Sequence, residues 1–158
     1  MMSSWDFMPG INNVFISKSG VITQDKDKLP VNDVNINLDF TLFGLNRLVG
    51  PIENDKRFFY VYIFLVYYEG GRNFEIISSA QIYCDESILE NDSVQFSTNL
   101  TIPDTNIYPD ADFILNYYSL EIAYSEREAE DGSDINGMLK HSSTSLFSTK
   151  LDVGIESE

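Results

Sequence analysis

Hydrophobic and polar residues alternate with a period of two along much of the chain. From Val34 to Leu42 every second residue is apolar, and Asn, Asp or Thr fills the positions between. Residues 94–102 follow the same alternation. Because successive side chains of a β-strand point to opposite faces, both segments are predicted to be strands with one buried face. In the first strand the predicted buried residues are Val34, Ile36, Leu38, Phe40 and Leu42, and the predicted exposed ones are Asn35, Asn37 and Asp39.

Residues 58–68 differ, because this run of eleven residues is apolar or aromatic throughout and both faces of a strand would be apolar. Such a strand either lies at the centre of the fold with a cover on each side, or presents one face to a partner. The pattern leaves both interpretations open. Gly70 and Gly71 follow and permit a tight turn, so residues 74–83 are predicted to return as the second strand of a hairpin.

Two more strands are predicted toward the C-terminus. In residues 113–124 the apolar positions change parity, and a β-bulge near Tyr118 or Ser119 would bring both sets to the same side. A last strand is indicated by four apolar residues, which are Phe147, Leu151, Val153 and Ile155.

The N-terminal part is predicted to be less regular. Residues 1–30 form an irregular segment or a small hairpin, in which residues 14–16 would pair with residues 21–23. Further along, Pro103 and Pro109 bracket a connection whose length is common where a chain crosses between two sheets.

Evidence for helix is limited to about one turn in each of two places. One is residues 87–92 and the other is residues 125–131, where Ser125 and Glu128 have the spacing of a capping box. Together these elements predict an all-β protein, a single-domain antiparallel β-sandwich over residues 1–158 with about seven to eight strands. A long acidic loop at residues 125–141 is expected before the last strand.

Charge is distributed very unevenly. Residues 1–72 contain eight acidic and seven basic residues, whereas residues 73–158 contain seventeen acidic residues and three basic ones, Arg127, Lys140 and Lys150. A field of this sign repels nucleic acid and anionic membranes and attracts basic protein surfaces. We therefore expect no direct binding to nucleic acid and no membrane association.

The chain contains no catalytic signature and no metal-binding motif. Cys84 and His141 are the single residues of their types, and the neighbouring Ser142 and Ser143 are badly placed to face His141 as nucleophile and base. A zinc site needs several such ligands, and the EF-hand pattern fails around Gly137. We expect no enzymatic activity, no catalytic residues, no cofactor and no metal. Cys84 and His141 are expected to have structural roles. An irregular calcium site in the acidic loop is the minor alternative.

The N-terminal residues and the longest apolar run both favour a soluble protein. Residues 1–10 lack the charged and apolar regions of a secretory signal, and residues 58–68 are shorter than the roughly 20 residues that cross a bilayer. We expect a cytoplasmic protein, although a mature form whose signal has been removed also fits.

The most informative functional feature is the acidic stretch before the last strand. We interpret it as an exposed, mobile loop that docks on a basic protein partner. One such protein would be an inhibitor that occupies a nucleic-acid-binding site. The alternative is a surface that only keeps the protein soluble. Other possibilities are a self-associating structural subunit of a particle, fibre or tail, and a carbohydrate-binding module with Tyr60, Tyr62 or Tyr68 as a sugar platform. The predicted partner-binding residues are Glu126, Glu128, Glu130, Asp131 and Asp134.

Overall fold

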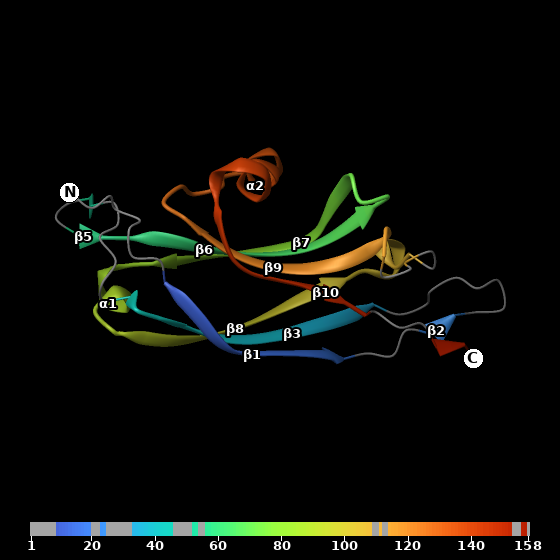
Figure 1. Ribbon diagram of the computed structural model, residues 1–158, viewed down its shortest axis with the longest axis horizontal. Helices are drawn as coiled ribbons and strands as arrows, with labels where there is room; N and C mark the ends of the chain where they lie inside the picture. Colours follow the sequence, from blue (N-terminus) through green and yellow to red (C-terminus); the bar gives the residue numbers. More distant parts are fainter. Residues whose placement is uncertain are drawn as a thin grey trace.

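Two antiparallel sheets pack face to face in a computed structural model of the protein, which describes residues 9–19, 23–24, 33–45, 52–53, 56–108, 111, 114–152 and 156–157. One sheet has three strands in the order β1-β3-β8 and the other has four in the order β10-β9-β6-β7 (Figure 1). The predicted all-β sandwich is therefore confirmed. The three-stranded sheet consists of β1 (Gly10–Ser19), β3 (Val34–Phe43) and β8 (Ser93–Ile102), and the four-stranded sheet of β10 (Thr144–Leu151), β9 (Tyr117–Ser125), β6 (Phe59–Glu69) and β7 (Asn73–Cys84).

Short strands add two small pairs outside the main sheets. β2 (Thr23–Gln24) pairs in parallel with β11 (Glu156–Ser157), and β4 (Ile52–Glu53) pairs with β5 (Lys56–Arg57). As predicted, the connection after Pro103 crosses from the three-stranded sheet to the four-stranded one, and it contains the 3-10 turn η2 (Asp104–Asn106).

The alternation of β3 reproduces the predicted burial. All five of its predicted core residues are buried, and Phe40 stacks on Phe96 of β8 at a ring-centroid distance of 5.3 Å. The intervening polar residues are half-buried and not fully exposed. They bond across to β8, where Ser97 donates to Asp39 and Thr101 donates to Asn35. Mutual contact between polar side chains therefore reduces their exposure on this outer face.

Both faces of β6 are covered within the chain, which settles the open interpretation of residues 58–68 in favour of a core strand. Phe59, Val61, Ile63 and Leu65 belong to the core between the sheets. On the opposite face Tyr62, Phe64 and Val66 lie in a second apolar cluster. That second cover is the helical cap, made of α2 (Gly132–Gly137) and the π-helical turn η3 (Met138–Ser142).

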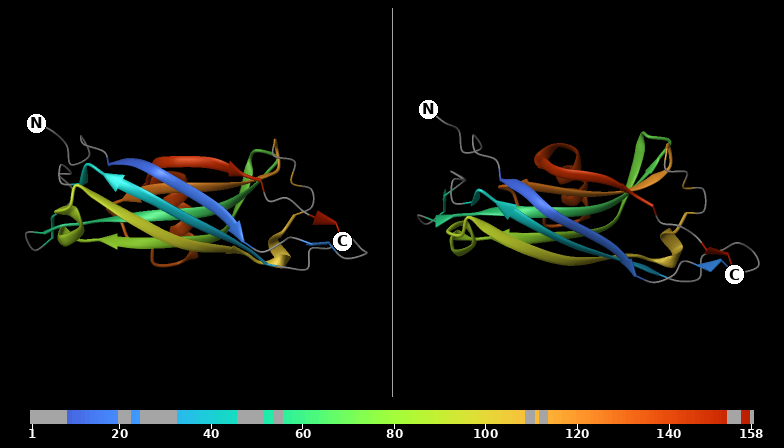
Figure 2. Two further views of the ribbon diagram at one scale, coloured as in Figure 1. Left: turned by 90° about the horizontal axis from the view of Figure 1, so that it is seen from below. Right: turned by 60° about the horizontal axis from the view of Figure 1, so that its bottom comes forward.

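The helical cap lies on the outer face of the four-stranded sheet, away from the three-stranded one (Figure 1). Seen from below, the three-stranded sheet stands in front and the cap lies behind the other sheet (Figure 2). Ile135, Met138 and Leu139 of the cap supply the apolar side chains that pack against β6. Apolar burial of this kind is what holds so short a helix in place.

The predicted helical turn at residues 125–131 is wrong, because the helix begins after Asp131. Ser125 still belongs to β9, where it is the register partner of Tyr60. Its hydroxyl accepts from the backbone N–H of Arg127, a local bond that competes with helix formation. The other predicted turn, at residues 87–92, corresponds to α1 (Glu86–Leu89), with Asp85 as its N-cap.

Two details of strand pairing also differ from the prediction. No bulge occurs near Tyr118, because β9 begins at Tyr117 and pairs with β6 without a shift along its whole length. Tyr118 points into the core with Leu120 and Ile122, whereas Phe113 lies outside the described residues. Register shifts occur instead in β1 between Asn12 and Phe15, in β7 opposite Leu65 and Val66, and in β10 between Ser145 and Phe147.

Where the structure describes the N-terminal segment, its strands pair with other partners than the predicted hairpin requires. Val14 and Ile16 belong to β1, which pairs with β3, and Thr23 pairs with β11. Val21 lies outside the described residues. In the predicted last strand, Phe147 and Leu151 belong to β10, while Val153 and Ile155 also lie outside the described residues.

Candidate partner-binding surface

The acidic segment, residues 126–134, leads from the end of β9 into the helical cap (Figure 1). Glu126, Glu128, Glu130 and Asp131 are exposed, and Asp134 is half-buried. All five predicted partner-binding residues thus lie in one stretch on the outer side of the four-stranded sheet. Exposure keeps these like charges in water, where their mutual repulsion is weak.

Tyr62 of β6 fixes the backbone at the start of this segment. Its hydroxyl donates to the carbonyl of Arg127 and accepts from the backbone N–H of Ala129 at 2.9 Å. The same N–H of Ala129 also reaches the side-chain oxygen of Gln81 on β7 at 2.8 Å. Burial raises the pKa of Tyr62 to about 12, so the hydroxyl remains protonated and continues to donate.

Two of the carboxylates help to begin the helix. Asp131 is the N-cap of α2 and accepts from the backbone N–H of Asp134 at 2.9 Å. Asp134 in turn accepts from the backbone N–H of Glu130 at 3.0 Å. The Asp131 carboxylate satisfies one of the donors that the first helical turn leaves without partners, and the Asp134 carboxylate bonds the backbone just before the cap. Asp131 and Asp134 therefore have a structural role in addition to their charge.

An aromatic step lies beside the acidic segment and was not predicted as a unit. It consists of Phe58, Tyr60 and Tyr83, with ring centroids 5.3 Å apart for Tyr60 and Tyr83 and 6.2 Å apart for Phe58 and Tyr83. Tyr83 is 54% exposed. Because Tyr60 pairs with Ser125, the residue before Glu126, the step adjoins the first carboxylates of the segment. The pairing register of the β6–β7 hairpin places Tyr83 opposite Tyr60. Counting residues from the predicted turn could therefore have indicated the aromatic step from the sequence.

The three tyrosines considered as a sugar platform do not form one exposed surface. Tyr62 is fully buried beneath the acidic segment. Tyr68 stacks on Tyr117 at 5.1 Å and donates to the Glu121 carboxylate at 2.8 Å. The half-buried Tyr60 belongs to the aromatic step.

Cys84 and His141 lie on opposite sides of the four-stranded sheet. Cys84 is buried in the core between the sheets, and burial raises the pKa of its thiol to about 12. His141 is exposed in η3, on the outer face. The adjacent hydroxyls have other contacts, since Ser143 donates to the carbonyl of Met138 and Ser142 accepts from Arg127. This arrangement does not assemble a nucleophile and a base.

Neither a metal cluster nor a membrane-spanning helix occurs in the described part of the chain. Among these residues no group of three or more His, Cys, Asp or Glu side chains is placed to hold a metal ion. The helices found there are too short or too polar to cross a membrane. Comparison of the chain with family models, curated proteins and solved structures found no match.

Proposed function

We propose that the protein is a non-enzymatic binding protein that docks on a basic protein through the acidic segment and the aromatic step. The observation that supports this most directly is the position of Glu126, Glu128 and Glu130. Their exposed side chains lie along backbone that Tyr62, Gln81 and the helical cap hold against the sheet.

Each part of this surface has a distinct physical contribution. Carboxylates accelerate encounter with a basic surface, an effect that weakens as salt screens the charges. Backbone that is ordered before binding loses less conformational entropy when the complex forms. Half-exposed tyrosine rings bury apolar area while their hydroxyls stay hydrated, and such residues often dominate binding energy.

The particular form that we propose is an inhibitor that occupies the nucleic-acid-binding site of its partner. Such a site presents Lys and Arg to phosphates, and closely spaced carboxylates present charge of the same sign. A competition assay tests this form directly. Duplex DNA or RNA should displace the protein from a partner that binds nucleic acid, and simultaneous binding of both would contradict it.

The general proposal is tested by association rates on an immobilised panel of basic proteins that includes nucleic-acid-binding enzymes. Charge at the site is removed by Glu126→Gln, Glu128→Gln, Glu130→Gln and Asp131→Asn together. A matched control removes four exposed charges elsewhere by Glu90→Gln, Asp92→Asn, Asp104→Asn and Asp152→Asn. Both variants have the same net charge, so a difference between them reports position.

We expect the site variant to associate about tenfold more slowly at low salt, with a flatter salt dependence, while the control stays within about twofold of the unmodified protein. Equal effects of the two variants would show that only net charge matters, and the proposed surface would be wrong. Light scattering at low and high salt is the companion measurement. Self-association that persists at high salt would favour the structural-subunit alternative.

A further inference from the structure

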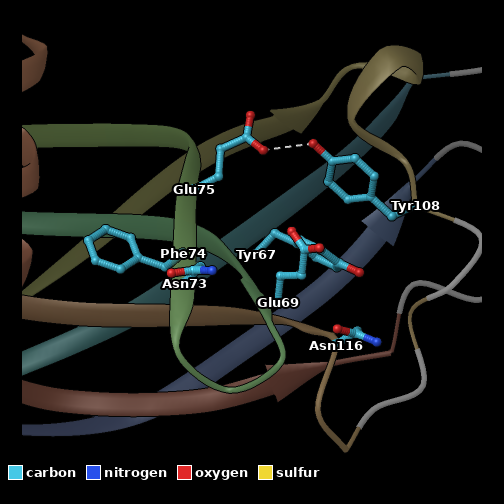
Figure 3. A pocket seen from close by; sticks show the side chains of 7 residues that line it. All are labelled: Tyr67, Glu69, Asn73, Phe74, Glu75, Tyr108 and Asn116. Carbon is cyan, nitrogen blue, oxygen red and sulfur yellow. Dashed lines mark hydrogen bonds between the residues drawn. The ribbon is translucent and has the colours of Figure 1, made fainter.

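A pocket of about 360 Å³ opens at one end of the sandwich. None of the residues that line it belongs to the acidic segment. We call it the terminal pocket. It lies between the turn of the β6–β7 hairpin and the connection that leads from β8 to β9 (Figure 3). Its lining combines aromatic rings, carboxylates and amides, principally Tyr67, Glu69, Glu75, Tyr108 and Asn116.

The walls of the terminal pocket are fixed by contacts from three separate segments. The rings of Tyr67 and Tyr108 are 4.3 Å apart between centroids. Tyr118 holds the connection in place, since its hydroxyl accepts from the backbone N–H of Tyr108 and donates to the carbonyl of Asn106, each at 2.8 Å. The side-chain oxygen of Asn116 accepts from the backbone N–H of Gly70 at 2.9 Å.

The turn on the other side of the pocket depends on two glycines. Gly70 and Gly71 have φ values of +64° and +72°, a backbone conformation that favours glycine. Gly71 donates its N–H to the carbonyl of Leu115 at 2.9 Å. The turn and the connection therefore bond to each other directly, and the pocket is formed before any ligand enters.

Negative charge in the pocket is retained after these internal bonds are made. Glu75 accepts from the Tyr108 hydroxyl at 2.7 Å and from the Asn106 side-chain amide at 3.1 Å. Both donors are neutral, so they orient the carboxylate without cancelling its charge. Glu69 adds a second carboxylate, and its side chain is exposed. Arg72 and Lys140 line a neighbouring pocket, which shares Asn73 and Phe74 with the terminal pocket, and neither cation lines the terminal pocket itself.

We infer that the terminal pocket binds a guanidinium group, supplied by an arginine side chain of the basic partner. A guanidinium is planar, carries several donors and a positive charge, and stacks on aromatic faces. The pocket offers the complementary set, namely two carboxylates and the half-buried ring of Tyr108, which the buried Tyr67 ring supports from behind. The identification of the arginine as part of a protein partner rests on the proposed function, whereas the recognition of guanidinium does not.

Ring-to-cation contacts already occur within this chain. The ammonium group of Lys150 lies 4.3 Å from the ring centroid of Tyr117, and that of Lys140 lies 5.2 Å from the ring centroid of Phe74. A neutral sugar is a poorer match for the terminal pocket. A neutral sugar carries no positive charge to pair with Glu69 and Glu75, and the hydroxyl of Tyr108 and the amide of Asn106 already donate to Glu75.

The test uses three short peptides that differ at one side chain, which is arginine, citrulline or lysine. Binding of each peptide is measured by nuclear magnetic resonance titration. Citrulline has nearly the shape of arginine and no charge. Titration up to about 10 mM covers dissociation constants near 1 mM. We expect the arginine peptide to bind at least about tenfold more tightly than the citrulline peptide and to shift the ring resonances of Tyr67 and Tyr108.

Two variants and one control locate the binding. Glu69→Gln combined with Glu75→Gln should weaken binding of the arginine peptide by about tenfold or more. Glu69→Gln alone, at an exposed position that leaves the Tyr108 contact in place, should weaken it several-fold. The control pair Glu90→Gln and Asp92→Asn removes the same charge elsewhere and should change the dissociation constant by less than about twofold.

Several outcomes would overturn the inference, and they differ from those that overturn the proposed function. Equal binding of arginine and citrulline peptides, no binding at the highest concentration, or an unchanged affinity in both Glu69 variants would each refute it. Binding of a neutral oligosaccharide in place of the arginine peptide would refute it too. If the arginine peptide binds but basic proteins do not bind the acidic segment, only the proposed function is wrong. If basic proteins bind the acidic segment but the arginine peptide does not bind the terminal pocket, only the pocket inference is wrong.

Discussion

Tyr62 connects the core of the protein to its candidate binding surface. Its ring is buried on the outer face of β6, and its hydroxyl meets the backbone of Arg127 and Ala129. This side chain thus helps to determine where the acidic segment leaves the sheet. Gln81 supports the same N–H of Ala129, so the carbonyl of Arg127 depends more strongly on Tyr62 than the N–H does.

Replacing Tyr62 with Phe should therefore loosen the acidic segment without unfolding the sandwich. The change leaves the Arg127 carbonyl without this donor, and we expect a loss of about 1–2 kcal/mol in the free energy of unfolding. Denaturant unfolding measures this loss, and amide hydrogen exchange should become faster across residues 127–130, with Ala129 partly protected by Gln81. Tyr83→Phe, at an exposed ring, is the control. Unchanged exchange throughout residues 127–130 would contradict the role given to Tyr62.

Stability should also fall at alkaline pH. Burial raises the pKa of Tyr62 from 10.0 to about 12, so the folded state holds the neutral phenol while the unfolded state ionises. The contribution to stability is complete below the unfolded pKa near 10 and is lost as the pH rises toward 12. The free energy of unfolding should decrease between about pH 10 and about pH 12, and by less in Tyr62→Phe. An equal decrease in both proteins would contradict this assignment.

Cys84 should be chemically inert in the folded protein. Burial raises the pKa of its thiol to about 12, and the thiolate is the reactive form. A thiol reagent at neutral pH should modify Cys84 slowly in the native protein and at the ordinary rate after unfolding. Fast modification of the native protein would contradict the burial.

Cys84→Ala and His141→Ala should leave binding to a basic partner unchanged if neither residue has a functional role.

At the scale of the element, strands β3 and β8 show how a simple alternation produces two different surfaces. Phe40 and Phe96 stack inside the sandwich, while Asp39 and Ser97, one residue earlier and later along these strands, bond on the outside. Successive cross-strand pairs therefore alternate between the two faces of the sheet. One pair stabilises the core, and the next forms polar contacts on the outer face.

Phe40→Ala should cost about 3–5 kcal/mol, as truncation of a large aromatic residue in a core does. Phe15→Ala, on the neighbouring strand β1, is the matched control because Phe15 is 66% exposed. The control should change the free energy of unfolding by no more than about 0.5 kcal/mol. Chemical denaturation of both variants provides the measurement, and similar costs at the two positions would contradict the face assignment of β3.

At the scale of the whole molecule, charge and fold are largely separate. The net charge of −15 comes mostly from residues after Arg72, yet the core consists of apolar side chains from both halves of the chain. Exposed carboxylates contribute little to folding and remain available for binding. Asp131 is the exception among the exposed acidic residues of the segment, because it caps α2.

Neutralising the acidic segment should therefore leave the fold nearly intact. In the variant with Gln at Glu126, Glu128 and Glu130, the substitution Asp131→Asn keeps an efficient N-cap. We expect its thermal midpoint to lie close to that of the unmodified protein at physiological salt. Asp131→Ala should instead lose about 1 kcal/mol, because the cap is removed. If Asp131→Asn destabilises as much as Asp131→Ala, the capping role is wrong.

The sequence by itself determined most strands of the two main sheets, the faces of β3 and the location of the acidic residues. These features depend on neighbours along the chain, because a period of two directly reports which side chains share a face. Only the tertiary structure decided what covers the second face of β6, since Tyr62, Phe64 and Val66 meet Met138 and its neighbours from a distant segment. It also decided that the acidic segment is anchored, and that β9 needs no bulge beside β6. The terminal pocket arose in the same way, because Glu75 and Tyr108 come together only when the β8–β9 connection closes over the hairpin. Local alternation contains no information about such long-range contacts, so they become visible only when both sheets and the cap are in place.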